Sequence, residues 1–360
     1  GARMRHTRGM SHADVFQPLS RDEVTAAVEG GSPRRVPLVR AKWWGEGLVD
    51  HYGSQLDRFD RFPDDVVHLF SANPVDPERM DLSWKWRSEG AHDARAVVDD
   101  WAKLDEFLEK MPDPASDPAW DGLERQAEAA HREGRYVLWG FWNLFFERPW
   151  MIRGMENLMI DYYVEVENIH RLHAAMADQY ARTIAEAKRR LDPDGFWTSD
   201  DLGHQSGPMM SPQIFHDLIH PYYCTVGEAV ARADQHFWLH SCGDNTLLLP
   251  DLVDAGVDVF HPVQKHTMDE RAVADEFGGR VAFLAGIDVQ HVLQEADAEG
   301  VREEVRFLVD TFDRPEGRMC IAAGNGIVPG TPLENIEAFL DEAVRYGAAH
   351  RARSSRGEAP

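Results

Sequence analysis

Cysteine is scarce in this chain, which has three in 360 residues: Cys224, Cys242 and Cys320. An odd number of widely spaced cysteines argues against a disulfide framework. Each thiol is therefore free to serve as a core residue, a metal ligand or a nucleophile. We expect a reducing compartment, and hence a cytoplasmic protein.

Long apolar runs and an excess of basic residues are also missing. The chain has no run of about 18 apolar residues, the length that a transmembrane helix needs. Its first residues, GARMRHTRGMSHAD, lack the apolar stretch of a signal peptide. Lysine and arginine total 38 against 62 acids, a formal charge of −24, which repels nucleic-acid phosphates and anionic membrane surfaces. We therefore expect neither nucleic acid nor a membrane as a partner.

Apolar residues make up 43% of the chain and charged residues 28%, which is typical of a folded globular protein. Short apolar runs recur along the sequence, and each run ends in polar or small residues. These runs are the predicted strands: 35–41, 65–71, 136–142, 195–201, 236–243, 257–262, 281–288 and 319–326.

Amphipathic helical patterns lie between most of the predicted strands. Residues 94–111 and 301–312 place apolar side chains three and four positions apart and acids on the outer face. A further helix is predicted to begin near Thr331 and Pro332. Eight strands that alternate with helices predict an α/β fold, a closed parallel (β/α)₈ or TIM barrel.

The length of the chain is compatible with one large domain, because α/β barrels commonly exceed the usual size of a single domain. We expect one barrel domain over residues 19–349. A flexible N-terminal segment, 1–18, and a flexible tail, 350–360, would flank it.

Polar residues follow the predicted strands, and in such barrels the chemistry lies at the carboxyl ends of the strands. The residues predicted to bind a small-molecule substrate at these ends are Arg40, Lys42, Trp43, Trp44 and Asn143. Tryptophans near the strands, at 43, 44, 139, 142, 150, 197 and 238, indicate either an aromatic pocket for a planar substrate or simply core residues.

The motif HSCG at 240–243 is the strongest candidate for a metal site. His240 and Cys242 are two residues apart at a strand end, so their side chains can point the same way, and imidazole and thiolate both suit Zn²⁺. The alternative is a hydrogen-bonded core histidine beside a small buried cysteine. The glycine that follows Cys242 favours a site, because it allows close backbone approach.

The motif DDLGHQ at 200–205 offers two carboxylates followed by a histidine and an amide. We predict that Asp200, His204 and Gln205 orient a substrate or hold a proton, while Asp201 is expected to cap the next turn. A structural role for Asp200 is an equal alternative. Asn325, in a GNG stretch before the last predicted helix, completes the predicted catalytic set, and the alternative there is a tight turn.

Four stretches, taken in order, resemble the uroporphyrinogen decarboxylase superfamily: FWTSDDLGHQSGPMMSPQIFHDLIHPYY, HSCGDNTLLLPDLVDAGVDVFHPVQ, FLAGIDVQHVL and GNGIVPGTPLENIEAFLDEAVRYG. The resemblance covers roughly residues 19–349 and is strongest from residue 130 on. It implies a (β/α)₈ barrel. The superfamily includes the haem-pathway decarboxylase and zinc-dependent methyltransferases that move a methyl group between a corrinoid protein and a thiol.

Three departures set the chain apart from the decarboxylase. The Arg-Gln-Ala-Gly-Arg run that binds propionate groups is replaced by VRAKWWGEG, with Arg40 and Lys42 as its basic residues. The aspartate of the Phe-Ser-Asp motif is Ala72 in LFSAN, and the histidine of Gly-His-Gly is Asn325. The groups that would hold and protonate the tetrapyrrole are therefore missing.

The methyltransferase branch has a His-x-Cys-Gly motif that supplies two zinc ligands, and HSCG matches it at His240 and Cys242. A further cysteine of that branch is replaced by Asn325. We predict His261 as the third ligand, with Asp244, Gln264 and Cys320 as alternatives and Cys320 the least favoured. Weaker zinc binding, another metal or none stays open.

The resemblance implies a methyltransferase or demethylase in which a metal activates a thiol, with a corrinoid supplied only through a partner protein. Two alternatives stay open. The first is a metal-independent decarboxylase or lyase that holds a small carboxylic acid with Arg40 or Lys42. The second is a barrel that binds a ligand without turnover.

Overall fold

The computed structural model describes residues 14–86, 96–314 and 318–357, and it has the TIM-barrel fold predicted from the sequence. Eight strands form one parallel sheet in the order β1-β10-β9-β8-β7-β4-β3-β2. They are β1 (Leu38–Val39), β2 (Val66–Phe70), β3 (Tyr136–Phe141), β4 (Gly195–Ser199), β7 (His236–His240), β8 (Val259–His261), β9 (Ala282–Ile287) and β10 (Met319–Ala323). Each lies inside one predicted strand range, so all eight predictions are confirmed.

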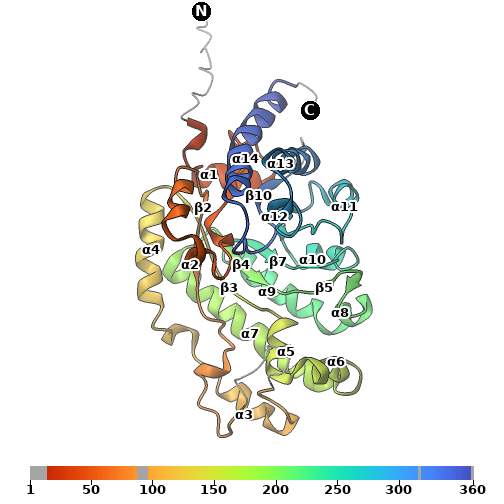
Figure 1. The fold of residues 1–360 in the computed structure, drawn as a ribbon. Coiled ribbons are helices and arrows are strands. Elements are labelled where there is room, and N and C mark those ends of the chain that lie inside the picture. The colour runs from red at the N-terminus through yellow and green to blue at the C-terminus, as the bar shows by residue number, and fades with distance from the viewer. Residues whose placement is uncertain (1–13, 87–95, 315–317, 358–360) are drawn as a thin grey trace, which may run out of the picture. The chain divides into compact units, whose positions relative to one another are not determined.

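The helices of the described residues alternate with these strands (Figure 1). They are α1 (Arg21–Glu29), α2 (Leu48–Tyr52), α3 (Leu104–Glu109), α4 (Trp120–Arg132), α5 (Glu147–Arg153), α6 (Met155–Val164), α7 (Val166–Leu191), α8 (Pro212–Leu218), α9 (His220–Arg232), α10 (Leu249–Asp254), α11 (Glu270–Phe277), α12 (Val292–Glu295), α13 (Ala298–Phe312) and α14 (Leu333–Ser354). No helix of the described residues is both long and apolar enough to cross a membrane.

The predicted helices agree with the structure in two places and differ in a third. The 301–312 pattern lies within α13, and α14 begins right after Pro332, as expected. In the 94–111 pattern only α3 and a short 3₁₀ turn before it, Trp101–Lys103, are helical. Residues 94 and 95 lie outside the described part. Asp100 ends the irregular segment before that turn, because its carboxylate accepts a hydrogen bond from the backbone N–H of Ala102.

Contacts divide the chain into two compact units. Unit 1 comprises residues 1–66 and 285–360, and unit 2 comprises residues 67–284. In unit 1, β1 pairs in parallel with β10, and α13 packs beside α14 (Figure 1). The last helix, α14, continues beyond residue 349 to Ser354.

A buried ion pair anchors the start of the sheet in unit 1. The guanidinium of Arg35 donates two hydrogen bonds to the carboxylate of Asp65, at 2.6 and 2.8 Å, and both side chains are fully buried. The same carboxylate accepts from the backbone N–H groups of Leu19 and Leu38. Every oxygen of this buried charge is therefore bonded, which the burial of a carboxylate requires.

Unit 2 contains the ladder β3-β4-β7-β8, in which β4, β7 and β8 end level with one another. Ser199, His240 and His261 are register partners at the ends of β4, β7 and β8. Three wholly buried tryptophans, Trp139, Trp197 and Trp238, fill the strands below them. These three tryptophans are therefore core residues. The polar side chains lie at the carboxyl ends of the strands, as expected for a parallel barrel.

Candidate functional site

His240 and Cys242 lie side by side at the carboxyl end of β7. Cys242 Sγ is 3.3 Å from His240 Nε2, so the two side chains point the same way, as their spacing predicts. His240 is 3% exposed, and Cys242 is partly exposed. A nitrogen and a sulfur donor thus meet at the edge of the barrel.

The glycine after Cys242 is required by a tight backbone crossing. Gly243 has φ +82°, and a Cβ placed on it would lie 2.2 Å from the carbonyl carbon of Gly203. The two loops are also hydrogen-bonded, because Gly203 N donates to Cys242 O at 3.2 Å. Gln264 Oε1 accepts from Gly243 N at 2.7 Å, which fixes the turn from its other side. The turn that presents Cys242 is therefore held by its backbone.

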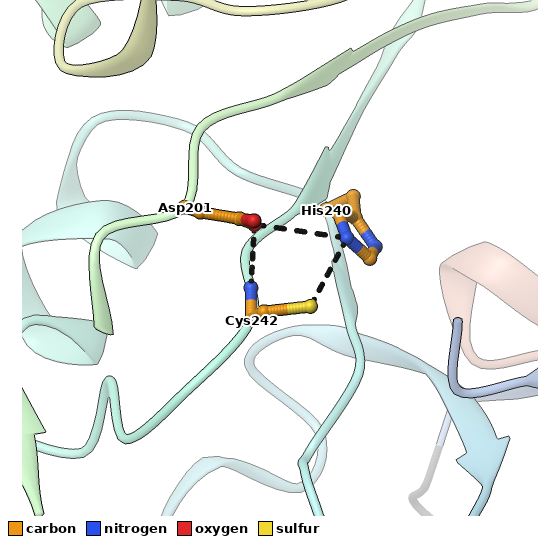
Figure 2. Close-up of side chains that lie close together, drawn as sticks. All are labelled: Asp201, His240 and Cys242. Carbon is orange, nitrogen blue, oxygen red and sulfur yellow. Dashed lines mark hydrogen bonds and ion pairs between the residues drawn. The ribbon is translucent and has the colours of Figure 1, made fainter. Parts of the chain in front are cut away.

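Asp201 completes a group of three potential metal ligands. Its Oδ1 accepts a hydrogen bond from Cys242 N at 2.9 Å and lies 3.7 Å from His240 Nε2. Figure 2 shows the three side chains converging, with Asp201 reaching in from the loop after β4. One ligand atom from each residue lies within 4.8 Å of the others. We call Asp201, His240 and Cys242 the strand cluster.

His261 lies behind His240, on the other side of the imidazole ring. The two Nδ1 atoms are 2.7 Å apart, and His261 is 1% exposed. One of these nitrogens must carry the proton that the other accepts. If Nε2 of His240 offers its lone pair to the cluster, then its Nδ1 donates to His261. The structure thus brings His261 to the site as a partner of His240, and its predicted role as a metal ligand stays a prediction.

Asp200 is fully buried, and its carboxylate is occupied by structural hydrogen bonds. It accepts from the backbone N–H groups of Phe145, Phe146 and Glu147, at 2.8 to 3.0 Å, and from the Tyr223 hydroxyl at 2.8 Å. It therefore caps the N-terminus of α5, where unpaired N–H groups favour a carboxylate. Burial raises its pKa to about 6. The predicted catalytic role of Asp200 stays a prediction, and these contacts favour a structural one.

Glu147, the first residue of α5, is a buried acid that sequence reasoning missed. Burial, and then the charges of Asp201 and Asp200, raise its pKa to about 8. Ser199 Oγ donates to its carboxyl at 3.1 Å, and the Asn143 side chain also bonds to it. At neutral pH Glu147 therefore holds a proton next to the strand cluster.

Asn143, a predicted substrate ligand, makes the turn between β3 and α5. Its φ is +70°, a left-handed conformation that asparagine tolerates better than most residues. Ser199 Oγ accepts from its backbone N–H, and its carbonyl accepts from Asn73. The structure therefore places Asn143 beside Glu147, at the same edge as the cluster.

Three aromatic rings form a wall beside the cluster. Trp142 and Phe70 are stacked with their planes 17° apart, and Trp142 meets Trp197 edge to face at 4.7 Å between centroids. The rings of Trp142 and Trp197 each lie 6.4 Å from that of His240. Trp142 is 45% exposed and Phe70 36%. We call Phe70, Trp142 and Trp197 the aromatic wall.

The other predicted catalytic residues of unit 2, His204 and Gln205, are exposed. They belong to a small antiparallel hairpin of β5 (Gly203–His204) and β6 (Gly207–Pro208) that the sequence did not predict. Asp244 N donates to His204 O at 2.8 Å, so the backbone of this hairpin supports the loop after Cys242. Their predicted catalytic roles stay predictions.

The remaining predicted substrate ligands lie in unit 1. Lys42 is partly buried, and burial lowers its pKa to about 7. Its Nζ lies 4.6 Å from the ring centre of the buried Trp43. Arg40 Nη1 is 3.5 Å from Asp60, and its guanidinium carbon lies 5.8 Å from the Trp44 ring centre. A substrate role for these four residues stays a prediction.

Asn325 and Cys320 also belong to unit 1. Asn325 is exposed in the bend after β10, where its Oδ1 accepts from Gly326 N at 2.7 Å. Its predicted catalytic role stays a prediction. Cys320 is fully buried in the middle of β10, and burial raises the pKa of its thiol. That environment agrees with the low preference given to Cys320 as a ligand.

Asp201 and Glu147 are the two residues that sequence reasoning undervalued. Of the adjacent acids, Asp201 was expected to cap a turn and Asp200 to act on substrate, but Asp200 forms the cap and Asp201 faces the cluster. Adjacent side chains at a strand end point to opposite sides, and this alternation predicts that Asp200 and Asp201 have different surroundings. The signal for Glu147 is an acid that directly follows the apolar run LFF.

Comparisons with known proteins agree with this architecture. A profile of the uroporphyrinogen decarboxylase (URO-D) family matches residues 53–346. The methylated-thiol–coenzyme M methyltransferase of Methanosarcina mazei is 23% identical over 135 residues, which make up 38% of this chain and 34% of that protein's length. A methyltransferase structure from Methanosarcina mazei has a TM-score of 0.62 at 13% identity, over 91% of this chain and 99% of that one. The structural likeness shows the fold, and the sequence likeness is a distant similarity to methyltransferases.

Proposed function

The chain belongs to the uroporphyrinogen decarboxylase family, and from this premise we propose that it is a methyltransferase or demethylase that uses a metal-activated thiol. The observation that carries the proposal is the strand cluster, in which a carboxylate oxygen, an imidazole nitrogen and a thiol sulfur face one another within 4.8 Å. These three donor types match the preferences of Zn²⁺. Methyl donor and acceptor would be a corrinoid carried by a partner protein and a small thiol.

The distances within the strand cluster fit a tetrahedral ion. With ligand bonds of about 2.0–2.3 Å, neighbouring ligands of a tetrahedral zinc lie roughly 3.3–3.8 Å apart. His240 Nε2 lies 3.3 Å from Cys242 Sγ and 3.7 Å from Asp201 Oδ1. Asp201, His240 and Cys242 would therefore hold the ion and leave a fourth position for a substrate thiol. A bound Zn²⁺ would keep that thiol ionised at neutral pH, and the thiolate is the reactive nucleophile.

The neighbouring residues would orient and serve this reaction. His261 would accept the Nδ1 proton of His240, so that Nε2 would keep its lone pair toward the cluster. Within the aromatic wall, Phe70 and Trp142 offer exposed apolar surface for a substrate, and the buried Trp197 packs edge to face against both rings. Glu147, whose pKa burial raises to about 8, would donate a hydrogen bond to a polar group of the substrate.

The experiment measures methyl transfer from free methylcobalamin to 2-mercaptoethanol, together with zinc content by elemental mass spectrometry. Cys242→Ala should lose the zinc of the strand cluster and lower the transfer rate at least about 100-fold, because a zinc ligand and the thiol activation go together. Cys320→Ala is the matched control, since that thiol is fully buried in mid-strand. It should keep both zinc and activity.

Two results would contradict the methyltransferase proposal: Cys242→Ala binding zinc at the strand cluster as tightly as the wild type, or transferring methyl groups as fast. The second candidate would then be the metal-independent decarboxylase or lyase on a small carboxylic acid. The raised pKa of Glu147, about 8, favours this candidate specifically, because a buried protonated acid can protonate a carbanion. In that case Glu147→Gln, and not Cys242→Ala, should abolish turnover.

A further inference from the structure

We propose a second metal-binding site in unit 2, on the helices around β7, formed by His220, Cys224 and Asp254. His220 is the first residue of α9, Cys224 follows one turn later, and Asp254 is the last residue of α10. One ligand atom from each lies within 4.8 Å of the others. We call these residues the helix cluster. It shares no residue with the strand cluster, and the proposal does not depend on the methyltransferase proposal.

The distances in the helix cluster suit a tetrahedral ion such as Zn²⁺. His220 Nε2 lies 3.4 Å from Cys224 Sγ and 3.3 Å from Asp254 Oδ2. Both values lie near the roughly 3.3–3.8 Å expected between neighbouring ligands when the metal–ligand bonds are about 2.0–2.3 Å. One imidazole nitrogen therefore contacts a sulfur and an oxygen at distances that an ion bound to all three would also require.

The backbone explains why these side chains meet. Residues four apart on a helix share a face, so His220 and Cys224 both point toward α10. Gly227, three positions after Cys224, lies on the same face, and a Cβ on it would come within 1.8 Å of the Ala255 carbonyl oxygen. The missing side chain lets the end of α10 approach α9 (Figure 1). Asp254, next to Ala255, is thereby brought to the histidine and the cysteine.

A second His–Asp pair extends the donor set. His216 Nδ1 lies 3.1 Å from Asp251 Oδ2, and the rings of His216 and His220 are stacked 5.3 Å apart with a 14° angle. These two residues and His220 form another group of potential ligands within 4.8 Å. A nitrogen of His216 or an oxygen of Asp251 would thus be available as the fourth ligand of an ion in the helix cluster. Otherwise a water molecule would be the fourth ligand.

The charges around the helix cluster favour a cation. Asp254, Glu228 and Asp251 place negative charge around the Cys224 thiol. Such charge attracts a divalent ion, and a bound ion would displace the thiol proton. The ion would link α9, which directly precedes β7, to α10, which directly follows it. It would thus clamp the two helices that flank the strand bearing His240.

The test titrates chelator-stripped, full-length protein with Zn²⁺ by calorimetry, in a Cys242→Ser background that disables the strand cluster. We expect one remaining equivalent of bound zinc. Adding Cys224→Ser should weaken that binding at least about 100-fold, because it removes the thiolate. Titration with Co²⁺ should give thiolate-to-metal charge-transfer absorption that depends on Cys224.

Asp254→Asn keeps the test valid if Cys224→Ser folds poorly, because the Asp254 side chain is 75% exposed. It should weaken zinc binding about tenfold. Asp217→Asn, an exposed acid on neighbouring α8, is the matched control and should leave the affinity unchanged. The proposal is overturned if the Cys242→Ser protein binds no zinc at about 100 µM, or if Cys224→Ser and Asp254→Asn both bind as tightly as their parent. Loss of one equivalent of zinc in Cys242→Ser, with one equivalent retained, is the expected result.

Discussion

The strand cluster and the helix cluster contain the same three residue types on two kinds of secondary structure. At the end of β7 the histidine and cysteine are two positions apart, and on α9 they are four apart, which is the spacing that an extended segment and a helix each need to bring two side chains together. In each cluster a glycine that follows the cysteine leaves room for a second backbone segment, at Gly203 in one case and at Ala255 in the other. The aspartate of the cluster belongs to that segment. Similar donor sets thus arise from different periodicities.

The surroundings, in contrast, differ, and they suggest different chemistry. His240 of the strand cluster is buried, hydrogen-bonded to His261 and bordered by the exposed ring of Trp142. In the helix cluster Asp254 is 75% exposed, and its neighbours are further acids and a histidine. A partly buried cluster with an aromatic wall suits a substrate, whereas an open cluster between two helices suits an ion that links them. The donor set alone does not distinguish these roles.

The largest effect should come from the two glycines that shape the clusters. Gly227→Ala should lower the free energy of unfolding by about 1–3 kcal/mol, because the new Cβ collides with the Ala255 carbonyl. Gly243→Ala should lower it more, since its φ of +82° adds backbone strain. Each variant should lose zinc from its own cluster only. Urea unfolding and zinc titration measure both effects.

Gly122 of α4 provides the control for this pair. A Cβ there would meet only the end of the Arg125 side chain, at 3.9 Å. Gly122→Ala should therefore stabilise the protein by about 0.5–1 kcal/mol through helix propensity. If Gly227→Ala is stabilising to the same extent, then α10 does not approach α9 as described, and the comparison of the two clusters fails.

The ionisation of Glu147, a buried acid near the strand cluster, should make the stability of the protein depend on pH. Its folded-state pKa is about 8 against an ordinary value of 4.5, so between these values the folded protein holds a proton that the unfolded chain has released. The contribution of Glu147 to the free energy of unfolding should therefore fall as pH rises from about 5 to 8, in total by on the order of a few kcal/mol. Glu147→Gln mimics the protonated acid and should remove this contribution from the slope measured by urea unfolding at several pH values.

Glu128, an exposed glutamate of α4, is the matched residue for the pH measurement. Glu128→Gln should leave the wild-type slope in place, because the Glu128 side chain is 70% exposed. A slope that is unchanged in Glu147→Gln would mean that the acid at the strand cluster is ionised at neutral pH. The protonation of Glu147 would then no longer distinguish the strand cluster from the more exposed helix cluster.

The smallest effect should come from replacing the aspartate of each cluster and comparing the losses of zinc affinity. Asp201→Asn and Asp254→Asn each replace a carboxylate by a weaker amide ligand, so each should lower zinc affinity at its own cluster by about tenfold. The Asp201 side chain is 38% exposed and that of Asp254 is 75% exposed, so the loss should be greater for Asp201, where water screens the charge less. Competition with a chromophoric chelator measures both affinities. Equal losses would show that burial does not distinguish the clusters.

The fold follows from the sequence more completely than the site does. Each buried strand is a short apolar run, so local composition suffices to find all eight. Residues 96–100 have a helical pattern but are not helical. The carboxylate of Asp100 accepts a hydrogen bond from the backbone N–H of Ala102, so the 3₁₀ turn begins after Asp100. The β5–β6 hairpin has two residues in each strand, too few for a periodic signal.

The site depends on contacts between segments that the sequence alone does not reveal. His240 and Cys242 were found because they are local, and their predicted proximity is confirmed. The structure places the Asp200 carboxylate against the N-terminus of α5 and the Asp201 carboxylate at the strand cluster, because adjacent residues at a strand end point to opposite sides. The helix cluster was missed because Asp254 is far from Cys224 in sequence, and the close packing at Gly227 that joins them is a property of the fold.

The cap formed by Asp200 has a consequence for local motion. The amide protons of Phe145, Phe146 and Glu147 all bind one carboxylate, which also binds Tyr223 on α9. These amides cannot be released to solvent one at a time, since the buried acceptor would be left without its partners. Their hydrogen exchange should therefore proceed through one shared opening of the segment before α5. Asn143 and Glu147 are on this segment, so one cooperative fluctuation would govern both the turn and the proton-bearing acid next to the strand cluster.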